Sequence, residues 1–174
     1  TVQEIVNELN AKVLFGAAHL NNQTGSFSVG AMQLRSYLLH LKENSLVITQ
    51  GDRADIILGA LQANESLNYQ TISGIVLTGN IVPEDSILKL IEGLSTIVPI
   101  IAVEEGTYFI TNKIGSIKSK IYANNKQTIK ISIATFEKYV DLDNLAEKLI
   151  TFEAEGMTPK MFQYNLVKRA REHR

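Results

Sequence analysis

The sequence contains no cysteine, and this absence removes several kinds of chemistry. A chain without cysteine forms no disulfide, has no thiolate nucleophile and holds no cysteine-ligated metal, and its composition fits a reducing, cytoplasmic compartment. Tryptophan is also absent and aromatic residues make up only 7% of the chain, which argues against a base-stacking surface. The formal net charge of −1 gives no general attraction to nucleic acid or membrane. We therefore expect neither of these as a partner.

Long apolar runs are missing as well. No stretch approaches the roughly 18 consecutive apolar residues of a membrane span, and no basic-then-apolar signal segment opens the chain. The 174 residues, 45% of them apolar, suffice for one domain with a sizeable core, or for one domain with an attached segment. The first residue is Thr1 rather than Met, and we expect the sequence to be a piece of a longer protein.

The motifs of common enzyme classes do not occur. The sequence has no Gly-x-Ser-x-Gly elbow, no phosphate-binding loop, no dinucleotide Gly-x-Gly-x-x-Gly and no His-Glu-x-x-His pair. Three scattered histidines, His19, His40 and His173, are interpreted as surface or half-buried residues. We predict no catalytic residue, no metal and no cofactor in this chain. An enzyme that uses Asp52 or Asp55 as its acid or base is the weaker alternative, because carboxylates alone can serve.

Three consecutive β–α units occupy the middle of the chain. Predicted strands at 46–49, 72–78 and 97–103 are followed by helical segments at 53–64, 84–93 and 108–118. The strands are apolar on both faces and begin about 25 residues apart, as in parallel strands joined by right-handed crossovers. A helix at 2–9, strands at 12–15 and 27–31 and a helix at 32–41 precede them. We predict an α/β fold with a mostly parallel central sheet and flanking helices.

The last third of the chain has a different pattern. Alternation over 128–133 predicts a short edge strand, and a helical stripe follows over 142–150. A linker over 153–158 leads to a final helix that begins at Pro159. We therefore divide the chain into an α/β domain over 1–120, a mixed extension and linker over 121–158, and a C-terminal helix over 159–174.

A charged run, Gly51-Asp52-Arg53-Ala54-Asp55, lies where the first of the three strands meets its helix. In a structural interpretation, Asp52 is the helix N-cap, Asp55 occupies the capping-box position and Arg53 is solvated or ion-paired. In a functional interpretation, Arg53 and the free N–H groups of the helix start hold an anionic group. The neighbouring carboxylates would then favour a ligand that also has donor groups, such as a nucleotide. Pairing of Arg53 across a subunit interface is a third possibility.

Two further loops, Thr78-Gly79-Asn80 and Glu104-Glu105-Gly106-Thr107, follow the next two strands. Gly79 in Thr78-Gly79-Asn80 permits positive φ or a close backbone approach, and Asn80 tolerates the left-handed region, although a simple tight turn explains the same residues. Pro83 is expected at the first position of the second helix, and Thr107 is expected to cap the third. Because the carboxyl ends of neighbouring parallel strands meet at one edge, we expect these loops to converge with the charged run.

This order of elements resembles the DRTGG domain, a family named for its Asp-Arg and Thr-Gly-Gly elements. Asp52-Arg53 corresponds to the first element and Thr78-Gly79-Asn80 to the second, with Asn80 in place of the final glycine. Asparagine reaches positive φ more readily than most residues, so the turn is expected to persist. The opening strand near 11–16 and the Val-Gly-Ala-Met run at 29–32 also resemble the family. The resemblance covers roughly residues 1–118.

The segment 157–166 is similar to the one that joins this domain to the catalytic domain of long bacterial phosphate acetyltransferases. The resemblance implies the non-catalytic middle region of such an enzyme, which interconverts acetyl-CoA plus phosphate with acetyl phosphate plus CoA in its C-terminal part. It further implies a regulatory and oligomerisation domain that self-associates as a dimer, contacts the catalytic domain and senses a metabolite or nucleotide. A purely structural dimerisation module without a ligand is the alternative.

Overall fold

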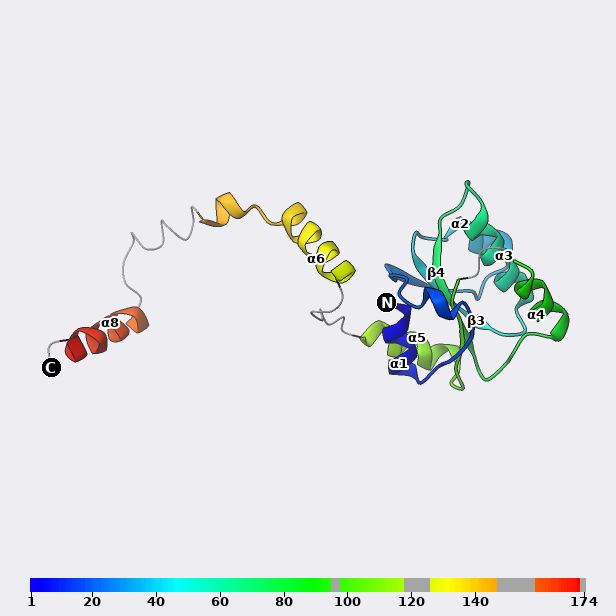
Figure 1. Cartoon of the computed structure of the whole chain (residues 1–174), viewed down its shortest axis with the longest axis horizontal. Coiled ribbons are helices and arrows are strands. Elements are labelled where there is room, and N and C mark those ends of the chain that lie inside the picture. Colours follow the sequence, from blue (N-terminus) through cyan, green and yellow to red (C-terminus); the bar gives the residue numbers. More distant parts are fainter. Residues whose placement is uncertain (95–97, 118–125, 147–158, 173–174) are drawn as a thin grey trace. The chain divides into compact units, whose positions relative to one another are not determined.

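The computed structural model describes residues 1–94, 98–117, 126–146 and 159–172. The chain divides into two compact units, Thr1–Ile117 and Lys118–Arg174 (Figure 1). Within the described residues, no helix combines the length and the apolar character that crossing a membrane requires. The two units are treated separately below.

The first unit is built around a five-stranded sheet with the strand order β1-β5-β4-β3-β2. Neighbours among β2, β3, β4 and β5 pair in parallel, whereas β1 pairs with β5 in the antiparallel direction. The predicted α/β fold with a mostly parallel sheet is confirmed. The strands are β1 (Lys12–Phe15), β2 (Ser26–Val29), β3 (Ser45–Gln50), β4 (Ile72–Thr78) and β5 (Ile100–Ala102).

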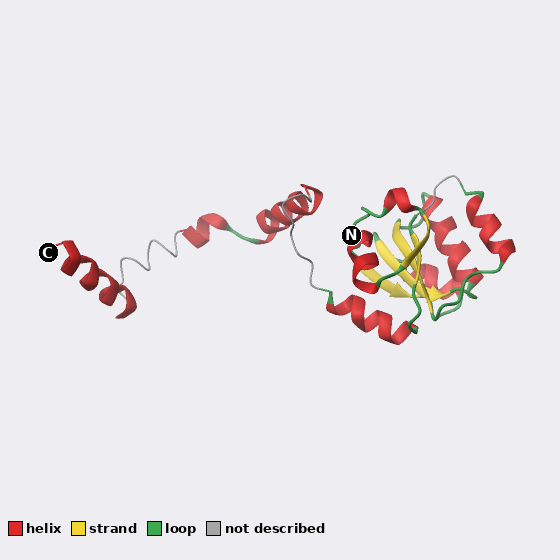
Figure 2. Cartoon of the chain, turned by 60° about the horizontal axis from the view of Figure 1, so that its bottom comes forward, coloured by secondary structure: helices red, strands yellow, loops and turns green. Residues whose placement is uncertain are grey.

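Helices cover both faces of this sheet (Figure 2). One apolar cluster joins α2, α3 and α4 to one face of the sheet, and a second joins α1 and α5 to the other. On β3, Val47 belongs to the first cluster while Leu46 and Ile48 belong to the second, which explains why the strand is apolar on both faces. The helices are α1 (Val2–Leu9), α2 (Leu34–Leu39), α3 (Ala54–Glu65), α4 (Asp85–Glu92) and α5 (Thr107–Ser116), with a short 3-10 turn, η1, at Ala17–His19.

Helix α4 begins later than the sequence suggests. Pro83 was expected at its first position, but the helix starts at Asp85 and Glu84 is the N-cap residue. Glu84 has an extended backbone, with φ −60° and ψ 154°, so the chain between Pro83 and Asp85 is not helical. Pro83 is instead buried before the helix begins.

The second unit contains helix α6 (Lys126–Tyr139), a helical turn at 142–146 and helix α8 (Pro159–Glu172). The predicted strand at 128–133 is wrong, because these residues lie inside α6. Apolar residues at 129, 133, 136 and 140 recur at helical spacing over a longer window than the local alternation, and this longer period prevails. Helix α8 begins at Pro159, as expected, and the proposed linker at 153–158 lies outside the described residues.

Candidate functional site

The loops that follow β3, β4 and β5 contact one another at the carboxyl edge of the sheet. A Cβ atom placed on Gly51 would collide with the carbonyl group of Ile81, so the first loop lies directly against the second. The Gly79 N–H donates to the Glu105 carbonyl oxygen at 2.8 Å, which joins the second loop to the third. The expected convergence of the three loops is therefore present in the structure.

Arg53 is the most highly connected side chain at this edge. Its Nε and Nη2 atoms donate to the two carboxylate oxygens of Asp55, each at 2.9 Å. Its Nη1 donates to the Gly30 carbonyl oxygen at 3.0 Å and its Nη2 to the Met32 carbonyl oxygen at 2.7 Å. Four of the five N–H bonds of the guanidinium are thus used internally. Arg53 fastens the loop between β2 and α2 to the start of α3.

The predicted cap of α3 is wrong. Arg53, with φ −86° and ψ 63°, is the N-cap residue and makes no side-chain capping hydrogen bond, while Asp52 is exposed. The Arg53 N–H donates to the Gln50 carbonyl oxygen in a turn that moves the helix start one residue past the expected position. Asp55 does not complete a capping box, because both of its carboxylate oxygens bind Arg53. The hydrogen bond from Arg53 lowers the pKa of Asp55 below its ordinary value.

Thr78 links the end of β4 to α5. Its hydroxyl lies 2.7 Å from the hydroxyl of Thr107, and it also donates to the Thr49 carbonyl oxygen at 3.3 Å. Thr107 does not cap α5 as predicted, because Gly106 is the N-cap residue and Thr107 is the first residue of the helix. The Thr107 hydroxyl is instead bound across the loops by Thr78, which is fully buried.

The turn after β4 keeps its shape with asparagine at the third position. Gly79 and Asn80 have φ values of 76° and 55°, so two successive residues adopt the left-handed conformation. The Asn80 N–H donates to the Val103 carbonyl oxygen at 3.0 Å, and the Gly79 N–H is also bound within the protein. Neither backbone N–H is available to a ligand in this arrangement.

The carboxyl edge is acidic. Each of the three loops carries two carboxylates, and Arg53 is the one basic residue among residues 51–55, 79–85 and 103–107. Because like charges repel and Arg53 is already bound to Asp55, this edge is poorly suited to a free phosphate. The six acidic residues are Asp52, Asp55, Glu84, Asp85, Glu104 and Glu105.

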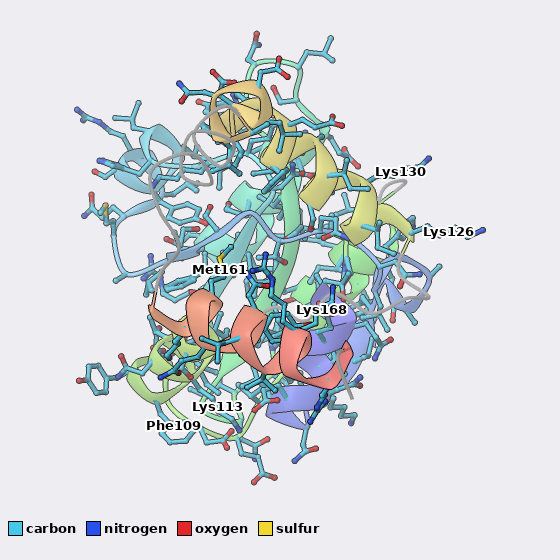
Figure 3. The ribbon with its side chains drawn as sticks, turned by 90° about the vertical axis from the view of Figure 1, so that its left-hand side faces the viewer. Phe109, Lys113, Lys126, Lys130, Met161 and Lys168 are labelled. Carbon is cyan, nitrogen blue, oxygen red and sulfur yellow. The ribbon has the colours of Figure 1, made fainter. Side chains whose placement is uncertain are left out.

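An aromatic pair stands on the outer surface of α5, next to this edge. Tyr108 is 84% exposed and Phe109 is 53% exposed. Lys113, one turn later on the same helix, places its Nζ atom 6.0 Å from the centre of the Phe109 ring (Figure 3). Exposed aromatic rings with a cation beside them are typical of surfaces that another molecule covers.

The comparison with protein families decides where this chain belongs. The DRTGG domain model matches residues 4–117, which span all five strands of the sheet. The chain belongs to the DRTGG domain family. Proteins named phosphate acetyltransferase are similar over nearly the whole chain: the one from Nitratidesulfovibrio vulgaris is 35% identical over 100% of the chain, and the one from Synechocystis sp. is 42% identical over 97%.

The chain spans about a quarter of these relatives, 25% of the Nitratidesulfovibrio protein and 24% of the Synechocystis protein. The phosphate acetyltransferase of Escherichia coli is 23% identical over 97% of the chain and is matched over 24% of its own length. Among solved structures, the chain is similar to the CBS and DRTGG domains of the regulatory region of Clostridium perfringens pyrophosphatase, complexed with its activator diadenosine tetraphosphate. The identity is 18% and the TM-score is 0.46, over 77% of this chain and 59% of that one.

In this DRTGG domain, the two elements that name the family hold loops together. Arg53 of the first element binds two carbonyl groups of the β2–α2 loop, and Thr78 of the second binds Thr107 on α5. Both elements therefore contribute to the architecture of the carboxyl edge. Among the residues that the structure describes, no group of three or more His, Cys, Asp or Glu side chains could hold a metal ion.

A cavity that the sequence reasoning missed lies at the opposite edge of the sheet. It has a volume of about 280 Å³, and residues just before β2, β3, β4 and β5 contribute to its lining. Four amide residues line it together with His19: Asn22, Gln23, Asn44 and Asn64. These residues come from separate parts of the sequence and form no motif, so the number of amides before the strands and at the end of α3 was the one sequence feature that could have indicated the cavity.

Proposed function

We propose that this DRTGG chain is a regulatory and assembly region of a phosphate acetyltransferase, the class of enzyme that interconverts acetyl-CoA plus phosphate with acetyl phosphate plus CoA. The observation that carries the proposal is the match of nearly the whole chain to about one quarter of relatives with that name. On this proposal, the remaining three quarters of the parent chain supply the catalytic groups. The sequence of this quarter contains none of the familiar catalytic motifs.

The proposed contact surface is the carboxyl edge, including the outer face of α5. This surface combines six carboxylates with the exposed rings of Tyr108 and Phe109. A partner subunit or the parent's own catalytic part suits such a surface better than a free phosphate does, because Arg53 would have to give up internal bonds to reach an anion. Binding at this edge would shift the parent enzyme between states of different activity.

Helices α6 and α8 are proposed to carry this coupling toward the rest of the parent chain. Several of their apolar side chains are largely exposed, so another surface is needed to cover them. Phe136 is 50% exposed on α6, and Leu166 is 55% exposed on α8. The position of helices with such faces depends on the surface that covers them. This dependence is what a coupling between a sensing domain and a catalytic domain requires.

A second candidate is a purely structural dimerisation module that binds no small molecule. One observation favours it: the guanidinium of Arg53 is bound to Asp55 and to two backbone carbonyl groups rather than presented to solvent. In that case the motif only shapes the edge, and two copies of the domain meet there.

Charge reversal at the carboxyl edge of the full-length enzyme tests the proposal. The variant Glu104→Lys with Glu105→Lys changes two exposed side chains and leaves the Arg53 and Thr78 bonds in place. Glu8→Lys, an exposed residue of α1, is the matched control. We expect the double variant alone to change the oligomeric mass or the response to metabolites, while catalysis is retained. An unchanged mass together with an unchanged response would overturn the role of this edge. A changed response at constant mass would overturn the purely structural candidate.

A further inference from the structure

The cavity at the amino edge of the sheet is lined by polar groups that carry no formal charge. Asn44 stands directly before β3, Thr71 before β4, and Asn22 in the loop before β2. Asn64, near the end of α3, and His19 of η1 also belong to the polar wall, together with Gln23 and Ser73. Among the residues that the structure describes, no Asp, Glu, Lys or Arg side chain is part of the lining. A ligand recognised here is therefore bound by hydrogen bonds between neutral groups rather than by ion pairs.

Three of the amides that line this cavity, Asn22, Asn44 and Asn64, are hydrogen-bonded and still have bonding capacity. Asn64 accepts the Ile72 N–H with its Oδ1 atom at 2.9 Å, and its Nδ2 group has no partner within the described residues. Asn22 donates from Nδ2 to the Ser73 carbonyl oxygen at 3.1 Å, which leaves its Oδ1 atom as an acceptor. Asn44 accepts the Thr71 hydroxyl at 3.4 Å and retains its own Nδ2 donors. The cavity thus offers fixed donors and acceptors side by side.

Hydroxyl groups nearby also have unused bonding capacity. Ser26 and Ser45 begin β2 and β3 and are paired in the parallel register. Their buried hydroxyl oxygens find no hydrogen-bond partner in the part of the chain that the structure describes. The amino edge therefore has polar groups that its internal contacts do not satisfy. At the carboxyl edge, Arg53, Thr78 and the Gly79 turn are bound internally, although the buried Thr49 hydroxyl near the end of β3 also has no partner within the described residues.

Apolar side chains complete the cavity. Ile72 and Val98 also line it and are almost fully buried. Because only 3% and 5% of these two residues is exposed, most of the surface that a ligand meets here comes from the polar groups. A volume of about 280 Å³ is just below the range of roughly 300–1,000 Å³ for ligand pockets, which favours a ligand no larger than a base or nucleoside.

We propose that the amino-edge cavity binds the nucleobase of a nucleoside or nucleotide. Carboxamides match the adjacent donor and acceptor atoms of a base with two parallel hydrogen bonds, as Asn and Gln do with adenine. The inference rests on the proposed regulatory function and names the ligand class and its site. It assigns recognition to the neutral base, so a phosphate or ribose attached to the base contributes little to affinity.

The chain offers a matched set of variants for testing this site. Three asparagines, Asn10, Asn44 and Asn80, have positive φ values of 49°, 51° and 55°. Glycine adopts this backbone conformation without strain, so Asn→Gly at each position removes a side chain while the backbone is preserved. Asn44 lies in the cavity, whereas Asn80 lies at the carboxyl edge. Asn10 ends α1, two residues before Lys12, which pairs with Ala102 at the carboxyl end of β5 and so lies away from the cavity.

Calorimetric titration of the 174-residue chain with adenosine, guanosine, cytidine and uridine measures binding directly. We expect at least one nucleoside to bind with an affinity that stays constant between low and high salt, since no ion pair is involved. Asn44→Gly is expected to weaken binding about tenfold, equivalent to about 1.4 kcal/mol. Asn10→Gly and Asn80→Gly are expected to leave it unchanged. His19→Ala is a second variant of the cavity. It tests the site independently if Asn44→Gly fails to fold.

Three results would overturn the inference. The first is that no nucleoside binds at millimolar concentration. The second is that Asn44→Gly and Asn10→Gly weaken binding equally, which would report a general change of fold. The third is evidence that the ligand lies elsewhere, either because Asn80→Gly alone weakens binding or because inorganic phosphate competes as well as the nucleoside does. This third result leaves the regulatory function standing. Binding at the cavity without any effect on the parent enzyme would instead contradict the function and leave the site standing.

Discussion

Replacing Arg53 by alanine removes a set of contacts whose combined stabilisation can be estimated. The bonds to the Gly30 and Met32 carbonyl oxygens stabilise the fold by about 1 kcal/mol each, since a net intramolecular hydrogen bond contributes about 0.5–1.5 kcal/mol. The Asp55 pair is more exposed, with side-chain exposures of 30% and 46%, so it adds only about 0.2–1 kcal/mol. Arg53→Ala is therefore expected to lower the free energy of unfolding by about 2–3 kcal/mol.

Urea unfolding of the 174-residue chain measures this loss, and the melting temperature should fall by about 4–12 °C. Arg53→Lys retains the charge without the planar fork and is expected to recover less than half of the loss. Arg35→Ala, an exposed arginine on α2, is the control and should change stability by less than about 0.5 kcal/mol. If Arg53→Ala behaves like Arg35→Ala, the internal bonds do not hold the loop, and the structural role assigned to Arg53 is refuted.

Three further predictions concern the same edge. Thr78→Val, which leaves the half-buried Thr107 hydroxyl without its partner, should destabilise the fold by about 1–3 kcal/mol in urea unfolding; an unchanged midpoint would contradict the bond. Gly51→Ala should lower the melting temperature far more than Gly106→Ala, because a Cβ at Gly51 meets the Ile81 backbone whereas one at Gly106 meets nothing within 4 Å; equal losses would count against the contact. The lowered pKa of Asp55 means that the unfolded chain binds its proton more readily, so the stabilisation is complete above the unfolded pKa of about 4 and is lost as the pH falls through the lower folded pKa. As the pH is lowered from 6 to 2, the free energy of unfolding should fall less steeply for Asp55→Asn than for the unchanged chain. Identical slopes would contradict the pairing of Asp55 with Arg53.

The central β–α units could be predicted because burial on both faces leaves a strong sequence pattern. Strand β4 is buried along its whole length, and its predicted bounds, 72–78, agree with the structure. Helix α6 shows the opposite case. Alternating isoleucines over 129–133 imitate a strand, and only a longer window reveals the helical period that the structure follows.

The convergence of the three carboxyl-edge loops was predictable from topology, but the bonds made there were not. Asp52 has the residue type of an N-cap, yet the turn closed by the Arg53 N–H places Arg53 itself at that position. Thr107 has the same preference, but the buried hydroxyl of Thr78 binds it instead. A local turn at Arg53 and a tertiary contact at Thr107 each outweigh a capping preference of about 1 kcal/mol, and the preferred residue type reveals neither of them.

The amino-edge cavity shows a further limit of sequence reasoning. The general rule for parallel sheets directs attention to the carboxyl ends of the strands. His19 comes from η1, Asn44 from the loop before β3 and Asn64 from the end of α3, and only the folded sheet brings them into one cavity. Each residue by itself has the sequence character of an ordinary turn or helix-end residue.

The measurement that tests the central claim most directly compares the parent enzyme with and without residues 1–117, the unit that contains the DRTGG domain. Acetyl transfer between CoA and phosphate is followed together with the oligomeric mass and the response to nucleosides and metabolites. A regulatory and assembly region predicts that the shortened enzyme still transfers acetyl groups but has a different mass or has lost its response. Loss of turnover in a shortened enzyme that remains folded and keeps its mass would contradict this account, because it would place catalytic groups within the DRTGG domain.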